Sequence, residues 1–198
     1  QARFAYVLLR ARAFNSSVYR AAGAGGESER GEGVNKPRVV VWFSCGAASA
    51  LAAKLAVEKH GERCVVVYCD TMASEHPDNA RFFADVEQWL GVPILKIRSE
   101  KYASVEEVFE KRRYMSGIAG AICTTELKKV PRMAWQQADD VHVWGYTSEE
   151  QDRIEAFEQN NPELLLEWIL RDNNIGKKWC LYLLEHAGIR LPEMYALG

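Results

Sequence analysis

The sequence predicts an α/β protein with a doubly wound, mostly parallel sheet of five strands. Short runs of Val, Ile and aromatic residues are apolar at most consecutive positions, which indicates strands buried on both faces, as in a parallel sheet. Segments with helical spacing separate these runs and predict crossover connections. Four of the strands are expected at 39–43, 64–69, 93–98 and 141–144. At 164–170 the spacing does not decide between a fifth strand and a short helix.

Three helices are defined by apolar periodicity and by the glycine that follows each of them. They are expected at 47–60, 77–90 and near 177–186. The first is rich in alanine, so it can pack closely against a sheet.

Local signals mark three further helices. Ser104–Glu107 has the capping-box pattern and should open one helix, and Ser148–Gln151 has it again and should open another. Between them, a helix after Cys123 is expected to be interrupted or kinked at Pro131, because proline lacks the amide hydrogen that the helix needs.

Composition separates an N-terminal extension from one folded unit. Residues 1–33 combine an arginine-studded apolar stretch with a Gly/Ala/Glu/Ser linker, and we expect them to form an extension or flexible arm outside the fold. The folded domain is expected at 34–198, which is long enough for a full core.

Charge and cysteine usage exclude several function classes. The chain of 198 residues has a net charge of −2 and a pI of about 6.2, which argues against a general nucleic-acid surface. No apolar run approaches the length of a membrane span. The five cysteines form no C-x-x-C pair and are odd in number, so neither a zinc ribbon nor a disulfide framework is indicated. We expect a reduced, cytoplasmic setting and no metal.

The turn after the first strand has the features of an anion site. Small residues join strand 39–43 to the helix, so unpaired backbone N–H groups and roughly half a positive charge of helix dipole converge there. Gly46 permits close approach of the backbone, and the Ser44 and Ser49 hydroxyls can add donors. The alternative is a tight turn that binds nothing. Cys45 is either a low-pKa thiolate at a helix N-terminus or an inert, buried small residue.

The second strand also ends in polar residues. Asp70 and Thr71 follow strand 64–69, at the edge where open α/β sheets bind ligands. Either Asp70 accepts a hydrogen bond from a ligand, or it caps the turn.

Stretches along the chain resemble motifs of known nucleotide enzymes. Ser44–Ser49 resembles the PP-loop of adenine-nucleotide α-hydrolases, and Asp70-Thr71 with Glu75-His76-Pro77 resembles their second-strand motif. Two more stretches and the end of the chain resemble phosphoadenosine-phosphosulfate (PAPS) reductases: Cys123 with Lys128, Lys129 and Pro131; Gly145 with Glu149 and Arg153; and the closing turn 190–198. The resemblance covers about residues 37–198 and is to compact members of the kind met in bacteriophages. It implies a Rossmann-like, adenine nucleotide α-hydrolase-like fold.

Three positions depart from those motifs. Ala48 stands where members that hydrolyse ATP carry an acidic residue, which favours the reductase branch. Met72 replaces the glycine after Asp-Thr. Ile122 precedes a lone Cys123 where iron–sulfur versions have Cys-Cys, so this chain cannot supply that Cys₄ cluster site.

The resemblance implies a role for each matched residue. The phosphate or sulfate would be held by the turn, through Ser44, Cys45, Gly46, Ala47 and Ser49. Asp70 and Thr71 would contact the ribose or adenine. The phosphosulfate oxygens would be neutralised by Lys128, Lys129, Arg132 and Arg153, each of which could instead lie on a solvated helix face. Gly145, at the end of the fourth strand, matches the glycine of the reductases' Gly…Glu…Arg stretch.

Three functions follow as alternatives. The first is a sulfonucleotide enzyme resembling PAPS reductase, served by a thioredoxin-type reductant, with PAPS as ligand and no covalently bound cofactor. The second is an ATP α-hydrolysing enzyme that adenylates a substrate for sulfur transfer. The third is a non-catalytic nucleotide-binding module. The nucleophile of the reductases lies in a Glu-Cys-Gly tail that these 198 residues do not contain. We therefore expect either a fragment or a protein that has lost the reaction, with Cys123 as the candidate thiol near the basic cluster.

Overall fold

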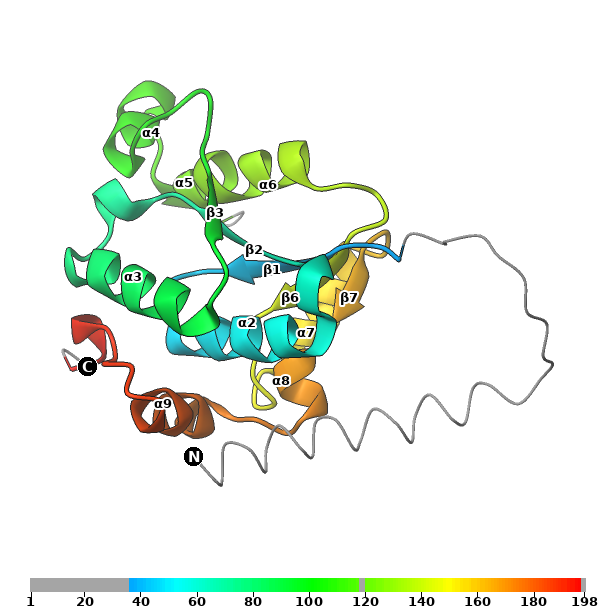
Figure 1. Ribbon diagram of the computed structural model, residues 1–198. Helices are drawn as coiled ribbons and strands as arrows, with labels where there is room; N and C mark the ends of the chain where they lie inside the picture. The colour runs from blue at the N-terminus through cyan, green and yellow to red at the C-terminus, as the bar shows by residue number, and fades with distance from the viewer. Residues whose placement is uncertain (1–35, 118–119, 197–198) are drawn as a thin grey trace.

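A computed structural model describes residues 36–117 and 120–196 of the chain. It contains a five-stranded parallel sheet in the order β3-β2-β1-β6-β7 (Figure 1). The strands are β1 Val39–Phe43, β2 Cys64–Cys69, β3 Ile94–Ile97, β6 Val141–Trp144 and β7 Leu165–Glu167. The predicted doubly wound fold class is therefore confirmed. The undecided segment 164–170 holds both β7 and the start of a short helix, α8, Ile169–Asp172.

Helices cover both faces of the sheet (Figure 1). The face below the sheet in this view carries α2 Ala47–His60, α3 Asp78–Leu90 and α9 Lys177–His186. The opposite face is covered by the segment that contains α5 Ile122–Thr124 and α6 Val130–Trp135. The other helices are α4 Val105–Arg112 and α7 Gln151–Asn160. A short antiparallel pair joins β4 Ser116–Gly117 to β5 Gly120–Ala121.

The central strand shows why the sequence has no polar alternation. Val39, Val41 and Phe43 belong to the core under α2 and α3, whereas Val40 and Trp42 belong to the core under α6. All five are buried, so β1 has no solvent-facing position. Burying an apolar side chain of this size contributes roughly 1.5–3 kcal/mol.

Alanines allow α2 to lie close to this sheet. Ala50, Ala52, Ala53 and Ala56 are fully buried around Leu51. The small side chains let the helix pack close to the sheet, and the short turn 44–46 places the N-terminus of α2 at the carboxyl end of β1.

The helix after Cys123 differs from a simple kink. A π-helical turn, Thr125–Lys129, lies between α5 and α6 and ends two residues before Pro131. Proline cannot donate to the carbonyl four residues earlier, and a wider turn is one way for a helix to absorb that loss. The predicted interruption is present, and it falls in the residues before the proline.

Two capping predictions have different outcomes. The Ser104 hydroxyl accepts from the amide of Glu107 (3.2 Å) and opens α4 as expected. The predicted box between Ser148 and Gln151 is wrong, because α7 begins after Glu150, whose carboxylate accepts from the amide (3.0 Å) and hydroxyl (3.2 Å) of Thr147.

The proposed N-terminal arm, 1–33, lies outside the described residues. None of the helices in the part of the chain that the structure describes has the length and apolar character needed to cross a membrane.

Candidate nucleotide site

The turn between β1 and α2 is tied together by one serine. The Ser49 hydroxyl accepts from the amides of Ser44 (3.1 Å) and Gly46 (3.4 Å) and donates to the Gly46 carbonyl (2.9 Å). Cys45 takes the left-handed conformation, φ 58°, which is unusual for a residue with a side chain. This bend turns the backbone N–H groups of the helix start toward the carboxyl edge of the sheet. Ser44 and Ser49 therefore shape the turn together, their hydroxyls 3.1 Å apart.

The first turn of α2 keeps donors available. The Ala47 amide donates to the Tyr195 hydroxyl at 3.1 Å. For the Ala48 amide, no acceptor is found among residues 36–117 and 120–196. Since the first N–H groups of a helix have no partner within it, they are the groups that an anion would engage.

Gly145 fixes the distance between this turn and the neighbouring strand. A Cβ at Gly145 would lie 2.7 Å from the Cα and amide nitrogen of Ser49. The glycine is thus required where the end of β6 passes the start of α2, and its role in the structure is close packing.

A cavity of about 680 Å³ opens beside the turn. It is lined by Ser44, Cys45, Gly46, Ser74, Glu75, His76, Asn79, Lys177, Met194 and Tyr195. The lining combines the amide-rich turn and a lysine with a carboxylate, so the cavity offers donors in one part and acceptors in another.

The C-terminal segment forms one wall of this cavity and is fastened to α3. The Asp78 carboxylate accepts from the Glu193 amide (2.9 Å) and from Arg190 (3.2 Å), and Arg81 donates to the carbonyls of Arg190 (3.0 Å) and Leu191 (3.1 Å). Hydrogen bonds from Arg81 hold the pKa of Asp78 well below its usual range. These bonds deliver Tyr195 to the α2 N-terminus.

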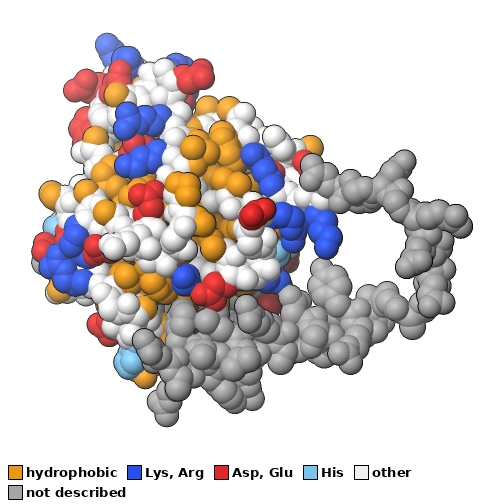
Figure 2. All heavy atoms as spheres, viewed as in Figure 1, with side chains coloured by type: hydrophobic (Ala, Val, Ile, Leu, Met, Phe, Trp, Pro, Cys, Tyr) orange, Lys and Arg blue, Asp and Glu red, His pale blue; other side chains and the backbone are white. Residues whose placement is uncertain are grey.

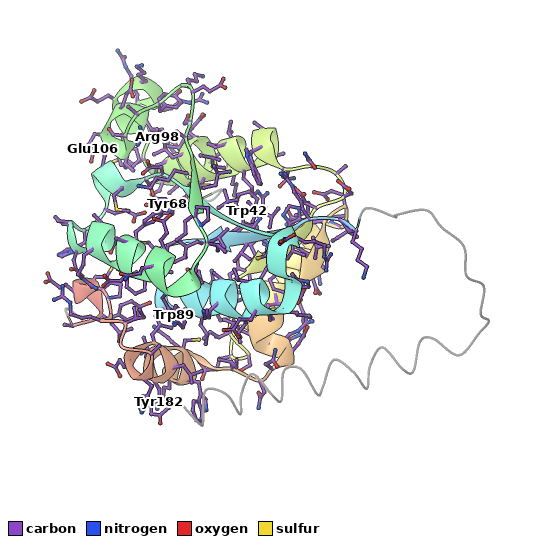
Figure 3. All side chains as sticks on the ribbon, viewed as in Figure 1. Trp42, Tyr68, Trp89, Arg98, Glu106 and Tyr182 are labelled. Atoms are coloured by element: carbon purple, nitrogen blue, oxygen red, sulfur yellow. The ribbon has the colours of Figure 1, made fainter. Side chains whose placement is uncertain are left out.

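Asp70 and Thr71 lie at the end of β2 but do not line the cavity. Asp70 accepts from Arg98, labelled in Figure 3, at 2.6 and 2.8 Å and from the Met72 amide at 3.2 Å. Thr71 donates to Glu75 Oε1 at 2.5 Å. Asp70 therefore caps the following turn, and Thr71 orients a carboxylate that does line the cavity.

Two of the five cysteines, Cys45 and Cys180, are buried. Burial, together with the nearby Glu75 carboxylate, raises the pKa of Cys45 to about 12, and its thiol donates to the Asn79 carbonyl (3.4 Å). Burial also raises the pKa of Cys180 to about 12. Cys45 is therefore the inert, buried alternative. Cys123 is partly buried against Leu127 and the core under α4, and it is absent from the cavity lining.

The predicted basic residues separate into different environments. Lys128 lies 3.8 Å from Glu75, and Lys129 is exposed. Arg132 is buried, with its guanidinium 5.3 Å from the ring centre of Trp144. Arg153 is mostly exposed, paired with Glu150 and placed over the ring of Tyr146. Of these four basic residues, Lys128 alone contacts a residue that lines the cavity, namely Glu75.

The surface around these elements is mixed in charge. Figure 2 shows Lys and Arg interspersed with Asp and Glu among apolar side chains on the visible face. Within the described ranges, no group of three His, Cys, Asp or Glu side chains is arranged to hold a metal ion.

Comparison with solved structures identifies the fold. The crystal structure of PAPS reductase from Candida auris, in complex with phosphate, superposes with a TM-score of 0.61. The match covers 83% of this chain and 80% of that chain at 11% sequence identity. The chain has the fold of a PAPS reductase. No protein-family model matches it, and no curated protein sequence matches it significantly. The expected Rossmann-like, PAPS reductase-like architecture is therefore present. The similarity is found in the structure and not in the sequence.

Seven cavity residues were not among the predicted site residues. They are Ser74, Glu75, His76, Asn79, Lys177, Met194 and Tyr195. Glu75 and His76 had a signal, because they belong to the matched second-strand motif. The C-terminal residues reach the cavity through tertiary contacts, for example the Tyr195 hydroxyl, which bonds a residue 148 positions away.

Proposed function

We propose that the protein binds an adenine nucleotide of the sulfonucleotide class, with an anionic group seated on the β1–α2 turn. The observation that carries the proposal is the cavity that the turn, Glu75 and the C-terminal segment enclose at the carboxyl edge of the sheet. Ligands of open α/β sheets bind at this edge, and the start of a helix favours an anion there. The PAPS reductase fold supports the same class of ligand.

Charge in the lining supports an anion as well. Lys177 lines the cavity, and Lys128 stands near it beside Glu75. The α2 dipole adds about 0.3–1 kcal/mol for a negative group near its N-terminus. Because of the matched motifs, we also propose that the protein is a compact relative of these reductases, of the kind met in bacteriophages.

We propose that the described residues bind the sulfonucleotide but do not reduce it. A reductase of this kind needs a thiolate to attack the sulfuryl sulfur, which forms an S-sulfocysteine and releases the adenosine bisphosphate. Cys45, the cysteine of the cavity lining, is protonated at neutral pH because its pKa is raised to about 12. We therefore expect no sulfite release with a thioredoxin-type reductant. Sulfite release that disappears in Cys123→Ser would overturn this part and make Cys123 the nucleophile.

The test is calorimetric titration with PAPS, adenosine phosphosulfate, AMP, inorganic phosphate and Mg-ATP. We expect saturable binding, strongest for PAPS and independent of metal. Gly46→Ala is the matched variant: its Cβ would meet nothing closer than 3.5 Å, so the fold should hold, but the methyl group stands where the phosphate approaches. Unchanged PAPS affinity in a folded Gly46→Ala protein would remove the phosphate from this turn, and preference for Mg-ATP would favour the α-hydrolase alternative.

A further inference from the structure

One part of the cavity lining presents acceptors, whereas the β1–α2 turn presents donors. Glu75 and Asn79 both line the cavity, one before α3 and one in its first turn. Packing alone does not explain either residue, because both have polar side-chain groups beside the cavity. Their hydrogen bonds show which of their acceptor atoms remain available to a ligand.

The Glu75 carboxylate is held in one orientation by its neighbours. Thr71 Oγ1 donates to Oε1 at 2.5 Å, and Asn79 Nδ2 donates to Oε2 at 2.8 Å. Lys128 Nζ lies 3.8 Å from Oε1. An ionised carboxylate accepts about four hydrogen bonds, so a carboxylate oriented by two side-chain donors keeps acceptor capacity for a ligand.

Asn79 has an acceptor that nothing uses. The side chain is 4% exposed, and its Nδ2 is committed to Glu75, which fixes the amide orientation. Its Oδ1 is buried without a hydrogen-bond partner within the described parts of the chain. An unsatisfied buried acceptor is costly and calls for a donor.

We propose that Glu75 and Asn79 form the nucleoside subsite, in which they accept hydrogen bonds from O–H or N–H donors of the bound nucleotide. The inference rests on the proposed function and adds the groups that orient the ligand. A nucleotide has its 5′ anionic group at one end and neutral donors at the other, the 2′-hydroxyl and the exocyclic amine, both of which PAPS retains although its 3′-hydroxyl is phosphorylated. The cavity has the complementary arrangement.

The same pair sets the direction in which the ligand lies. With the 5′ anionic group beside Glu75 and Asn79 Oδ1, like charge and like polarity would oppose binding. With the 5′ group on the turn, it meets the helix-start donors instead, which makes Glu75 a specificity-determining residue.

The experiment compares two probes, AMP and inorganic phosphate, by calorimetry on the full chain. Glu75→Gln keeps the size of the side chain and replaces an acceptor oxygen by a donor. We expect AMP affinity to fall at least fivefold and phosphate affinity to remain within twofold. Asn79→Ser should lower AMP affinity in the same way, and Glu110→Gln, an exposed carboxylate on α4, is the control for loss of one negative charge. Thermal melting verifies the fold of each variant.

Two further nucleotides identify the donor. A loss with 2′-deoxy-AMP, relative to AMP, assigns the ribose hydroxyl, and a loss with IMP assigns the exocyclic amine; either supports the subsite. Equal losses of AMP and phosphate in Glu75→Gln, or no loss of either, would overturn it. Wild-type protein that binds phosphate and AMP equally would overturn the subsite while the phosphate site stands. Wild-type protein that binds neither would overturn the proposed function itself.

Discussion

Gly145→Ala tests whether the close approach of β6 to α2 positions the anion site. The added Cβ would lie 2.7 Å from the Cα and amide nitrogen of Ser49 and 3.0 Å from its Cβ, where ordinary contacts are 3.4 Å or longer. The obstacle is mostly helix backbone, which cannot rotate aside. The start of α2 must therefore move by several tenths of an ångström.

The magnitude combines two opposing effects. Overpacking of a well-packed interior costs about 1–3 kcal/mol. Replacing glycine restricts the unfolded chain and returns about 0.4–1 kcal/mol. At the middle of both ranges the net loss of stability is about 1.3 kcal/mol, which for a domain of this size lowers the melting temperature by roughly 3–5 °C.

Urea unfolding measures the stability, and calorimetry with PAPS measures the site. We expect Gly145→Ala to lose both stability and affinity, because displacing the first turn of α2 moves its donors. Gly46→Ala is the control for stability alone, because it is itself expected to weaken PAPS binding: its Cβ meets only ordinary contacts, so stability should change by no more than about 1 kcal/mol, the usual scale of a helix-cap substitution. A Gly145→Ala protein with wild-type stability and wild-type affinity would refute the packing argument.

Three further outcomes follow from the same contacts. Tyr195→Phe frees the Ala47 amide, so phosphate should bind up to about fivefold more tightly, on the scale of one neutral hydrogen bond; weaker binding by calorimetry would mean that the hydroxyl contacts the ligand. Because burial raises the pKa of Cys45 from 9.0 to about 12, its contribution to stability is complete below pH 9 and is lost above it. The alkaline fall in melting temperature should be shallower in Cys45→Ala, and an identical slope would contradict this. Burial opposes ionisation of Asp140, but hydrogen bonds led by the one from Arg38 lower its pKa, so stability is lost as the pH falls below about 3.8. Asp140→Asn should therefore cost about 1.5–3 kcal/mol of stability near neutral pH and remove part of this acid dependence.

The sheet was predictable because its signals are local. The runs 39–43, 64–69 and 141–144 coincide with β1, β2 and β6, since consecutive β-branched and aromatic residues suit strands buried on both faces. Helix α2 likewise ends where Gly61 follows it. Boundaries decided by one residue were less accessible: α7 begins after Glu150 and not after Ser148, and the Glu150 carboxylate accepts from the amide and hydroxyl of Thr147.

The site was predictable only where it is continuous in sequence. The β1–α2 turn was identified from Ser44–Ser49, since strand, small residues and helix follow one another. For Asp70 the sequence left open a ligand contact or a turn cap, and its carboxylate accepts from Arg98, at the end of the neighbouring strand, and from the Met72 amide. Tyr195 reaches the turn only because Asp78 and Arg81 fasten the C-terminal segment to α3, and no local pattern encodes that contact.

The most direct test of the account is to follow the backbone amides of Gly46, Ala47 and Ala48 by nuclear magnetic resonance while PAPS is added. If the anion sits on the start of α2, these amide resonances should shift in a saturable way, with the affinity that calorimetry measures, and Ala47 should report loss of its bond to Tyr195. Inorganic phosphate should shift the same amides at higher concentration. Saturable PAPS binding that leaves these three resonances unmoved would contradict the account, because the nucleotide would then lie elsewhere.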